Sequence, residues 1–271
     1  MELEISTKRN STFEKIAWDI FFESKQRGVS FDRHFPWISS SSNKVWYLIA
    51  KYGDTVVGGL VLKEKIYSFD NKIFKLGLIG LVCVKTEFRT LGIASKLIKE
   101  ATTFVTANRL DALTLWTGKP AIYEKHGFVG KDPWLYGSVN RTDAIINRSK
   151  FLSVSNNHRQ RLDLALPPFA RSVSEYFDDQ STAIIVQDSA DCILMEYSGV
   201  ASNVAAMLAT RMPPRWRINV TNNDPLLEQL VQLGLNIAIQ PSNLQMWFCL
   251  NKNYTVDTIA ELVIVQPLER I

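Results

Sequence analysis

Cysteine and histidine are scarce in this chain of 271 residues, which contains three of each. The cysteines, Cys83, Cys192 and Cys249, are far apart and odd in number, so neither a metal-binding cluster nor a redox pair is indicated. The histidines are equally isolated, which leaves no basis for a Ser-His-Asp triad or a histidine metal site. We therefore expect reduced thiols and no metal.

Long hydrophobic segments are also missing. The longest apolar run, Leu76 to Val84, is less than half of a membrane span. The first residues, Met-Glu-Leu-Glu-Ile-Ser, lack the basic and apolar regions of a signal peptide. These features predict a cytoplasmic protein with no membrane partner.

Charge is unevenly distributed, although the net value is only +4. Residues 1–150 hold 23 Lys/Arg and 15 Asp/Glu, whereas residues 151–271 hold 8 and 12. This asymmetry fits a basic half that faces an anionic cofactor, or solvated surfaces that differ by chance. No basic stripe interleaved with aromatic residues is present, so we expect no nucleic-acid partner.

Hydrophobic periodicity predicts an α/β (α+β) protein of two domains. The first domain, 1–140, is expected to have helices over 12–25, 95–109 and 120–126, and strands over 45–50, 55–67, 112–116 and the run that ends at Val84. A polar linker over 141–157 follows. The second domain, 158–271, is smaller, with helices over 171–177, 200–210 and 225–233 and strands over 183–186, 192–196, 217–220 and 246–250.

The most informative segment runs from Leu78 to Ala101. An apolar strand leads into a short turn that contains Arg89, Gly92 and Ala94, and a helix begins directly afterwards. Backbone N–H groups point outward at a helix start, where the helix dipole favours negative charge. The pattern predicts a binding site for a cofactor that carries phosphate.

Arg89-Thr90-Leu91-Gly92-Ile93-Ala94 matches the acetyl-CoA signature of the GNAT acyltransferases, (Gln/Arg)-x-x-Gly-x-(Gly/Ala). About thirty residues later, Tyr123-Glu124-Lys125-His126-Gly127-Phe128 resembles the Tyr-x-x-x-Gly-Phe motif of the same family. The resemblance covers about residues 10–140. It implies the GNAT fold, a mixed and mostly antiparallel sheet flanked by helices, and acetyl-CoA as co-substrate.

The resemblance also implies roles for individual residues. Backbone groups of Val82 and Val84 would pair with the pantetheine arm, and Tyr123 would donate a proton to the departing thiolate. The pyrophosphate would lie on the turn and the helix start, formed by Arg89, Thr90, Leu91, Gly92, Ile93, Ala94 and Ser95.

One departure from the family concerns the general base. Many members have a Glu on the strand before the phosphate turn, but Gly80 to Val84 contain no carboxylate. An ordered-water relay, Glu64, or the C-terminal carboxylate of Ile271 could replace it, and the sequence leaves these alternatives open. The missing carboxylate is also the main argument for a non-catalytic acyl-CoA-binding or regulatory module.

The second half contains a weaker copy of the first at an offset of 107 residues. Gly199-Val200-Ala201-Ser202 repeats Gly92-Ile93-Ala94-Ser95, while Glu196 replaces Arg89 and Leu230 replaces Tyr123. Negative charge at the phosphate position and the loss of the phenol predict a degenerate GNAT-like domain without a second active site.

The sequence therefore predicts an enzyme that moves an acetyl group from acetyl-CoA to a primary amine of a small molecule. Direct attack in a ternary complex is expected, with the acceptor between the two halves. Candidates to line that site are Trp37, Trp46, Trp134 and Tyr136. The acidic second half favours a cationic acceptor such as an amino sugar or a polyamine, and a homodimer is left open.

Overall fold

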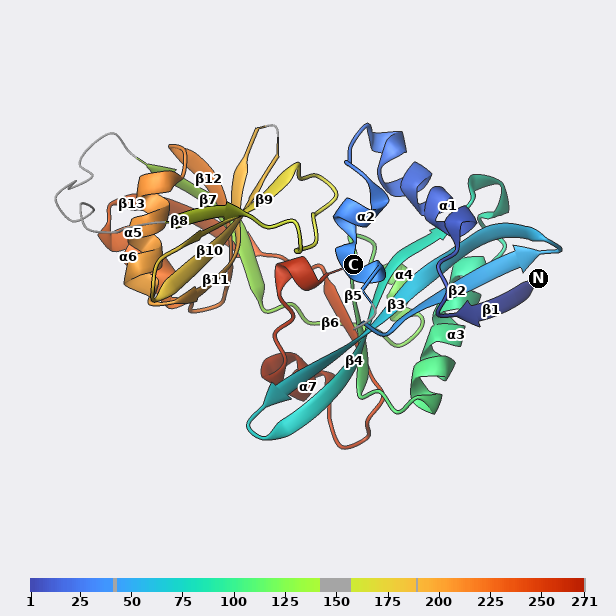
Figure 1. Ribbon diagram of the computed structural model, residues 1–271. Coiled ribbons are helices and arrows are strands. Elements are labelled where there is room, and N and C mark those ends of the chain that lie inside the picture. Colours follow the sequence, from blue (N-terminus) through green and yellow to red (C-terminus); the bar gives the residue numbers. More distant parts are fainter. Residues whose placement is uncertain (41–42, 142–156, 189, 271) are drawn as a thin grey trace. The chain divides into compact units, whose positions relative to one another are not determined.

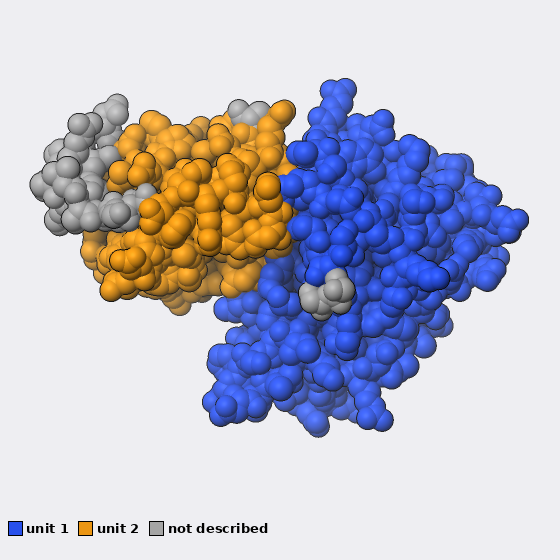
Figure 2. Space-filling view, in the orientation of Figure 1, with its two compact units in different colours: residues 1–132, 243–265, 269–271 blue, residues 133–242, 266–268 orange. Residues whose placement is uncertain are grey.

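A computed structural model describes residues 1–40, 43–141, 157–188 and 190–270. Its ribbon is a mixed α/β arrangement with two mostly antiparallel sheets (Figure 1). The chain forms two compact units (Figure 2). Unit 1 contains residues 1–132, 243–265 and 269–271, and unit 2 contains residues 133–242 and 266–268. Most of the expected linker, and Ile271 itself, lie outside the described residues.

The sheet of unit 1 has the order β1-β2-β3-β4-β5-β14-β6. Its strands are β1 (Glu2–Ser6), β2 (Val45–Tyr52), β3 (Thr55–Phe69), β4 (Lys72–Val84), β5 (Ala112–Trp116), β6 (Val129–Gly130) and β14 (Gln245–Cys249). Neighbouring strands are antiparallel except for β4 and β5, which are parallel.

Helices cover both faces of this sheet. They are α1 (Ser11–Phe21), α2 (Phe31–His34), α3 (Ile93–Ala107), α4 (Ala121–Glu124) and α7 (Val256–Leu262), with short 3-10 turns η1 (Glu23–Lys25), η2 (Pro36–Ile38) and η3 (Thr86–Phe88). A last 3-10 turn, η5 (Pro267–Glu269), has residues in both units. The apolar stripe of α3 packs into one core with alternate residues of β2, β3 and β4. A second core joins β4, β5 and β14 to α7.

The sheet of unit 2 has the order β13-β7-β12-β11-β10-β9-β8. Its strands are β7 (Trp134–Arg141), β8 (Asn157–Gln160), β9 (Ser172–Phe177), β10 (Ser181–Gln187), β11 (Cys192–Gly199), β12 (Arg215–Thr221) and β13 (Leu235–Pro241). Helices α5 (Ala201–Arg211) and α6 (Pro225–Gln232) pack on it.

The two sheets exchange one strand each. Strand β14, near the end of the chain, lies between β5 and β6, and β7 lies at the equivalent place between β12 and β13. The compact units therefore do not coincide with the expected ranges 1–140 and 158–271, because β7 belongs to the second sheet and β14 to the first.

One expected helix is wrong. Residues 172–177 form β9, which pairs with β10 over its whole length. Ser, Val, Tyr and Phe in this segment are residues that fit a half-buried strand, and partner strands on both sides favour the extended conformation.

Candidate functional site

Strand β4 carries a β-bulge in its second half. Leu81 and Val82 together oppose one residue of β3, Leu60, and the register shifts at this point. Leu81 has a left-handed φ of 54°. A Cβ on Gly58 of β3 would come within 2.5 Å of the Cys83 carbonyl oxygen, so glycine is required beside the bulge. Bulges of this kind redirect backbone groups and are common next to active sites.

Beyond the last paired residues, β4 and β5 separate. Their parallel pairing ends at Leu78 and Thr114, whereas β4 continues to Val84. Among the described residues, no strand pairs with this last part of β4 on the side of β5. The edge that contains Val82 and Val84 is therefore open to hydrogen bonding by an extended ligand.

The turn after β4 leads into a helix whose first N–H groups are free. Thr90 and Gly92 both have left-handed φ values, 70° and 72°, and no side chain caps α3. The first helical bond runs from the Lys96 N–H to the Gly92 carbonyl, at 3.1 Å. In the described part of the chain, the N–H groups of Gly92, Ile93, Ala94 and Ser95 have no acceptor. Such groups at a helix start bind anions.

Arg89 lies exposed at the entrance to this turn. Its Nε donates a hydrogen bond to the Val84 carbonyl, at 3.2 Å, which fixes the side chain at the end of β4. Its other guanidinium nitrogens have no partner among the described residues. Leu91 is 53% exposed, and a Cβ on Gly92 would have nothing within 4 Å. The turn therefore has open space in front of it.

Tyr123 lies in the core that contains Val84 and Ile93. It belongs to α4, is 9% exposed, and packs edge-on against Phe128. Its hydroxyl makes no hydrogen bond within the described residues, and burial raises the pKa of this phenol. The structure thus brings Tyr123, the end of β4 and the start of α3 into contact with one core.

Glu64 is poorly placed for the role of general base. Its carboxylate forms an ion pair with Lys44 at 3.0 Å. In the sheet it opposes Gly77, four residues before the bulge at Leu81, which is about 13 Å along a strand. Ile271 lies outside the described residues, so its carboxylate stays an expectation.

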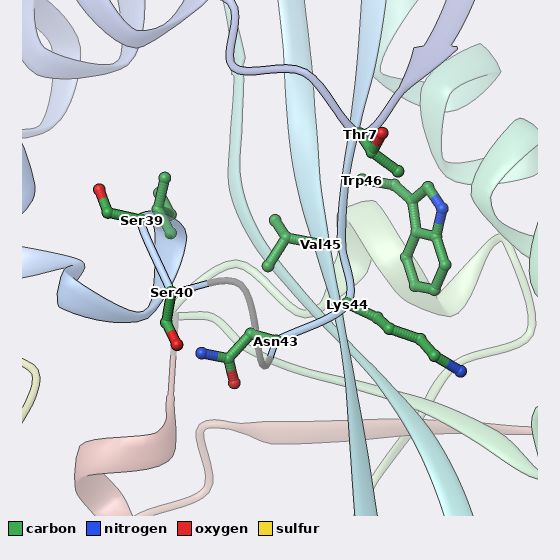
Figure 3. Close-up of a pocket in the computed structure, with 8 residues that line it drawn as sticks. Thr7, Ser39, Ser40, Asn43, Lys44, Val45 and Trp46 are labelled. Atoms are coloured by element: carbon green, nitrogen blue, oxygen red, sulfur yellow. The ribbon is translucent and has the colours of Figure 1, made fainter.

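An open pocket of about 490 Å³ lies beside the start of β2 (Figure 3). It is lined by Thr7, Ile38, Ser39, Ser40, Asn43, Lys44, Val45 and Trp46. Of the four aromatic residues expected to line the acceptor site, only Trp46 lines this pocket. Trp37 is buried in η2, while Trp134 and Tyr136 belong to β7 of unit 2.

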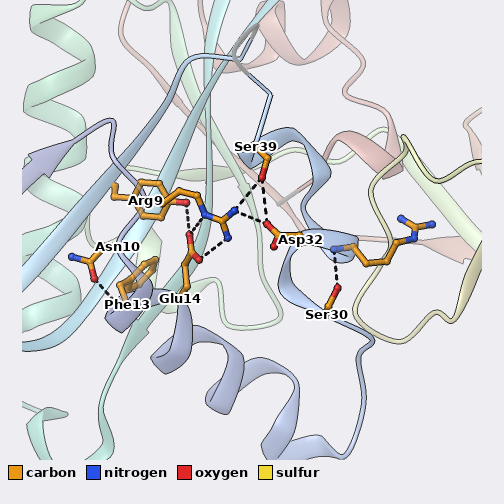
Figure 4. Close-up of polar contacts among 9 residues, drawn as sticks. Arg9, Asn10, Phe13, Glu14, Ser30, Asp32 and Ser39 are labelled. Carbon is orange, nitrogen blue, oxygen red and sulfur yellow. Dashed lines mark hydrogen bonds and ion pairs between the residues drawn. The ribbon is translucent and has the colours of Figure 1, made fainter.

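A charged network holds the segment that carries Trp37 (Figure 4). The Arg9 guanidinium donates to Glu14 at 2.7 and 2.8 Å, to Asp32 at 2.6 Å and to Ser39 at 3.0 Å. The Tyr47 hydroxyl donates to Glu14 at 2.8 Å. Burial, followed by the Glu14 charge, raises the pKa of Tyr47, and Glu14 raises the pKa of Arg9. The network connects α1, α2, β2 and the residue after η2.

Unit 2 repeats this architecture without the open site. Strand β11 has a bulge at Met195, and its parallel pairing with β12 ends at Leu194 and Ile218. Here the side chain of Asn219 bridges the two strands where they separate. Its Nδ2 donates to the Leu194 carbonyl at 3.1 Å.

The residues that replace the expected chemistry in unit 2 have structural contacts. Glu196 accepts a hydrogen bond from the Leu268 N–H at 2.8 Å, and Leu230 is fully buried. The N–H of Val200, at the start of α5, donates to the Ser181 hydroxyl at 3.1 Å. At the start of α5 the Val200 N–H is thus taken by a protein group, whereas no side chain caps the N–H groups that follow it.

No group of three or more His, Cys, Asp or Glu side chains that could hold a metal ion occurs in the described ranges. Over the same ranges, no helix has the length and hydrophobicity needed to cross a membrane.

Comparison with known proteins identifies a family model that matches part of the chain. Residues 18–129 match the model of the acetyltransferase (GNAT) domain. This part of the chain is a GNAT domain. GNAT domains use acyl-CoA as co-substrate for acyl transfer. Among curated proteins, none matches the sequence.

Solved structures share the fold of the GNAT domain together with the second half. A GCN5-related N-acetyltransferase from Anabaena variabilis is 11% identical, with 92% of this chain and 73% of that chain covered and a TM-score of 0.65. Eis1 from Mycobacterium abscessus is 11% identical, with coverage of 93% and 74% and a TM-score of 0.64. A tandem GNAT protein from the clavulanic acid biosynthesis pathway is 10% identical, with coverage of 92% and 99% and a TM-score of 0.53.

Proposed function

We propose that this protein transfers an acetyl group from acetyl-CoA to a primary amine of a small molecule. The observation that carries the proposal is the bulged strand β4, which separates from β5 and leads directly into the uncapped helix α3. In this proposal, Val82 and Val84 pair with the pantetheine arm along the open edge. The pyrophosphate lies on the turn formed by Arg89, Thr90, Leu91, Gly92, Ile93, Ala94 and Ser95.

Tyr123 is the proposed proton donor to the departing CoA thiolate. Its raised pKa keeps the phenol protonated at neutral pH. A thiolate that leaves into an apolar core is poorly solvated, so its affinity for a proton rises and the phenol can supply one. The hydroxyl has no competing partner among the described residues.

Direct attack by the amine is favoured over an acyl-enzyme intermediate. Cys83, in β4, is 5% exposed, and burial raises the pKa of its thiol to about 12. Burial also raises the pKa of Cys192 and Cys249. The thiolate is the nucleophilic form of cysteine, so these thiols are unsuited to carry the acetyl group. The amine then loses its proton to an ordered water or to another acceptor, and activity is expected to rise toward alkaline pH.

The test is CoA release from acetyl-CoA in the presence of a panel of amines. We expect amine-dependent release by the full-length protein. Tyr123→Phe is expected to lower kcat by about 10–100-fold with unchanged CoA affinity, because only the proton transfer is lost. Tyr176→Phe, in unit 2, is the matched control and should behave as the wild type.

The alternative function is a non-catalytic acyl-CoA-binding or regulatory module, favoured by the absence of a carboxylate between Gly80 and Val84. Calorimetric binding of CoA without amine-dependent release from any member of the panel would support that alternative. Absence of CoA binding to folded protein would refute both.

A further inference from the structure

Several polar side chains of unit 1 have no hydrogen-bond partner among the described residues. Lys63 of β3 is only 6% exposed, and its Nζ lies 4.8 Å from the centre of the Trp37 ring. It makes no hydrogen bond or ion pair within the described residues. The indole nitrogens of Trp37 and Trp116 and the Oε1 of Gln245 are buried without hydrogen-bond partners in the same part of the chain. Buried polar groups are normally satisfied, so each of these requires an explanation.

The strand register places three of these groups on one face of the sheet. Lys63 opposes Leu78, and Leu78 opposes Thr114, so their side chains point to the same side. Trp116 lies two residues beyond Thr114 and therefore shares this face, as does its register partner Gln245. The Gln245 Nε2 donates to the Thr114 hydroxyl at 3.0 Å.

Strands β4 and β5 separate just beyond these residues. Leu78 and Thr114 are the last residues at which β4 and β5 pair, and Lys63 lies beside Leu78 in β3. The bulge at Leu81 begins three residues later, about 10 Å along the strand. Trp37 of η2 covers Lys63 on this face, and the Arg270 guanidinium lies 5.4 Å from the centre of the Trp116 ring.

Lys63 is not neutralised by an acidic neighbour. Burial lowers the pKa of Lys63 to about 8, the charge of Lys65 lowers it further, and only Glu269 acts in the opposite direction. Glu269 is itself held by Lys65, at 2.6 Å, and by the Tyr67 hydroxyl, at 2.9 Å. Three donors, the ammonium and two indole N–H groups, thus accompany a single acceptor on Gln245. That excess of donors and of positive charge suits a small anion.

We propose that Lys63, Trp37 and Trp116 bind a carboxylate carried by the amine acceptor, so that the substrate is an amino acid or a similar amine. This rests on the proposed acetyl transfer. A carboxylate held by Lys63 leaves the amine of the same molecule to extend along β4 toward the bulge, where the open edge begins about 10 Å along the strand. A monoanion matches the single charge of the Lys63 ammonium, which has no ion-pair partner among the described residues. The proposal replaces the expectation of a purely cationic acceptor such as a polyamine.

The first experiment compares matched amines that share one skeleton: phenylalanine, phenylalanine amide and phenethylamine, with similar sets built on leucine and lysine. We expect the carboxylate member to have a KM at least about 10-fold lower in one or more sets. Lys63→Met should raise that KM and abolish the preference for the carboxylate member over the other members of its set. Lys75→Met, an exposed lysine of β4, is the matched control and should keep the preference. Equal use of the amide and the acid by the wild type would overturn the proposal.

A second readout does not need activity. Lys63 is labelled with an amine-acylating reagent, and the modified residues are quantified by mass spectrometry, with Lys75 as internal reference. Phenylalanine, leucine or their N-acetyl derivatives should protect Lys63, whereas the amides should not. Protection without transfer to any amine would refute the transferase and keep the carboxylate site. Transfer to amines without selective protection would refute the carboxylate site alone.

Discussion

Replacing Lys63 by methionine should stabilise the protein, because the wild type keeps an ammonium buried without a counter-ion in the described residues. Lowering the pKa from the ordinary 10.5 to about 8 corresponds to about 3 kcal/mol of destabilisation of the folded state while the group is charged. Methionine has a similar length and loses the interaction with Trp37, which is worth about 1 kcal/mol. The net expected gain near pH 7 is about 2 kcal/mol.

The stability gained by Lys63→Met should become smaller as the pH rises. Between about pH 8 and 10.5 the unfolded chain keeps the proton on Lys63 and the folded protein does not, so wild-type stability rises with pH in that range. Below pH 8 the penalty is constant. The advantage of the variant should therefore be complete near pH 7 and fall to about 1 kcal/mol or less near pH 10.

Urea denaturation at both pH values, followed by tryptophan fluorescence, measures this difference. Lys75→Met serves as control because its side chain is exposed, and it should change stability by no more than about 0.5 kcal/mol. A Lys63→Met protein that is less stable than the wild type near pH 7 would show that the ammonium has a structural partner. If the difference in unfolding free energy between Lys63→Met and the wild type does not change with pH, the lowered pKa assigned to Lys63 is refuted.

Three further predictions concern the turn, the network and the exchanged strand. Leu91→Glu puts negative charge on the expected phosphate turn and should weaken CoA binding about 10-fold in calorimetry, whereas Leu162→Glu, at a more exposed site in unit 2, should not. Arg9→Met removes charged hydrogen bonds and should cost about 1–2 kcal/mol in urea denaturation, with a rise in the KM for the amine if Trp37 moves. Gly137→Ala should destabilise unit 2 by about 2–4 kcal/mol, because a Cβ would lie 1.9 Å from the Ala238 carbonyl oxygen; unchanged stability would mean that β7 is not held in the second sheet.

The strand-turn-helix of the GNAT domain could be predicted from the sequence because its signals are local. The apolar run to Val84, the glycine at position 92 and the amphipathic helix after it lie within thirty residues. The GNAT fold and the layout of two GNAT-like halves are confirmed by the family match and the similar structures. The roles of Tyr123 and of the turn residues stay predictions.

The exchange of β7 and β14 between the two sheets could not be predicted, because it depends on packing between residues that are far apart in the sequence. Strands β7 and β14 take equivalent places in the two sheets, each among strands that are distant in the sequence. Strand β1 could not be predicted either, because its five residues are too few to show a hydrophobic periodicity.

The burial of Lys63 could not be predicted from the sequence, for a different reason. With Lys65 it suggests that this face of β3 is exposed to solvent, but η2 and the C-terminal segment cover it. One feature of the sequence does indicate its burial: Lys63 is two residues after Val61, so the two side chains lie on the same, buried face of the strand.

The exchange of β7 and β14 has a consequence for biosynthesis. Thr114 of β5 and Met246 of β14 are 132 positions apart, and the hydrogen bond between them exists only when β14 is in place. The ribosome must therefore have released β14, and with it all of unit 2 up to Ser242, before the GNAT sheet can close between β5 and β6. Until then the exposed edges of both strands are open to aggregation, so chaperones should bind the nascent protein for longer than they bind one whose domains close in order.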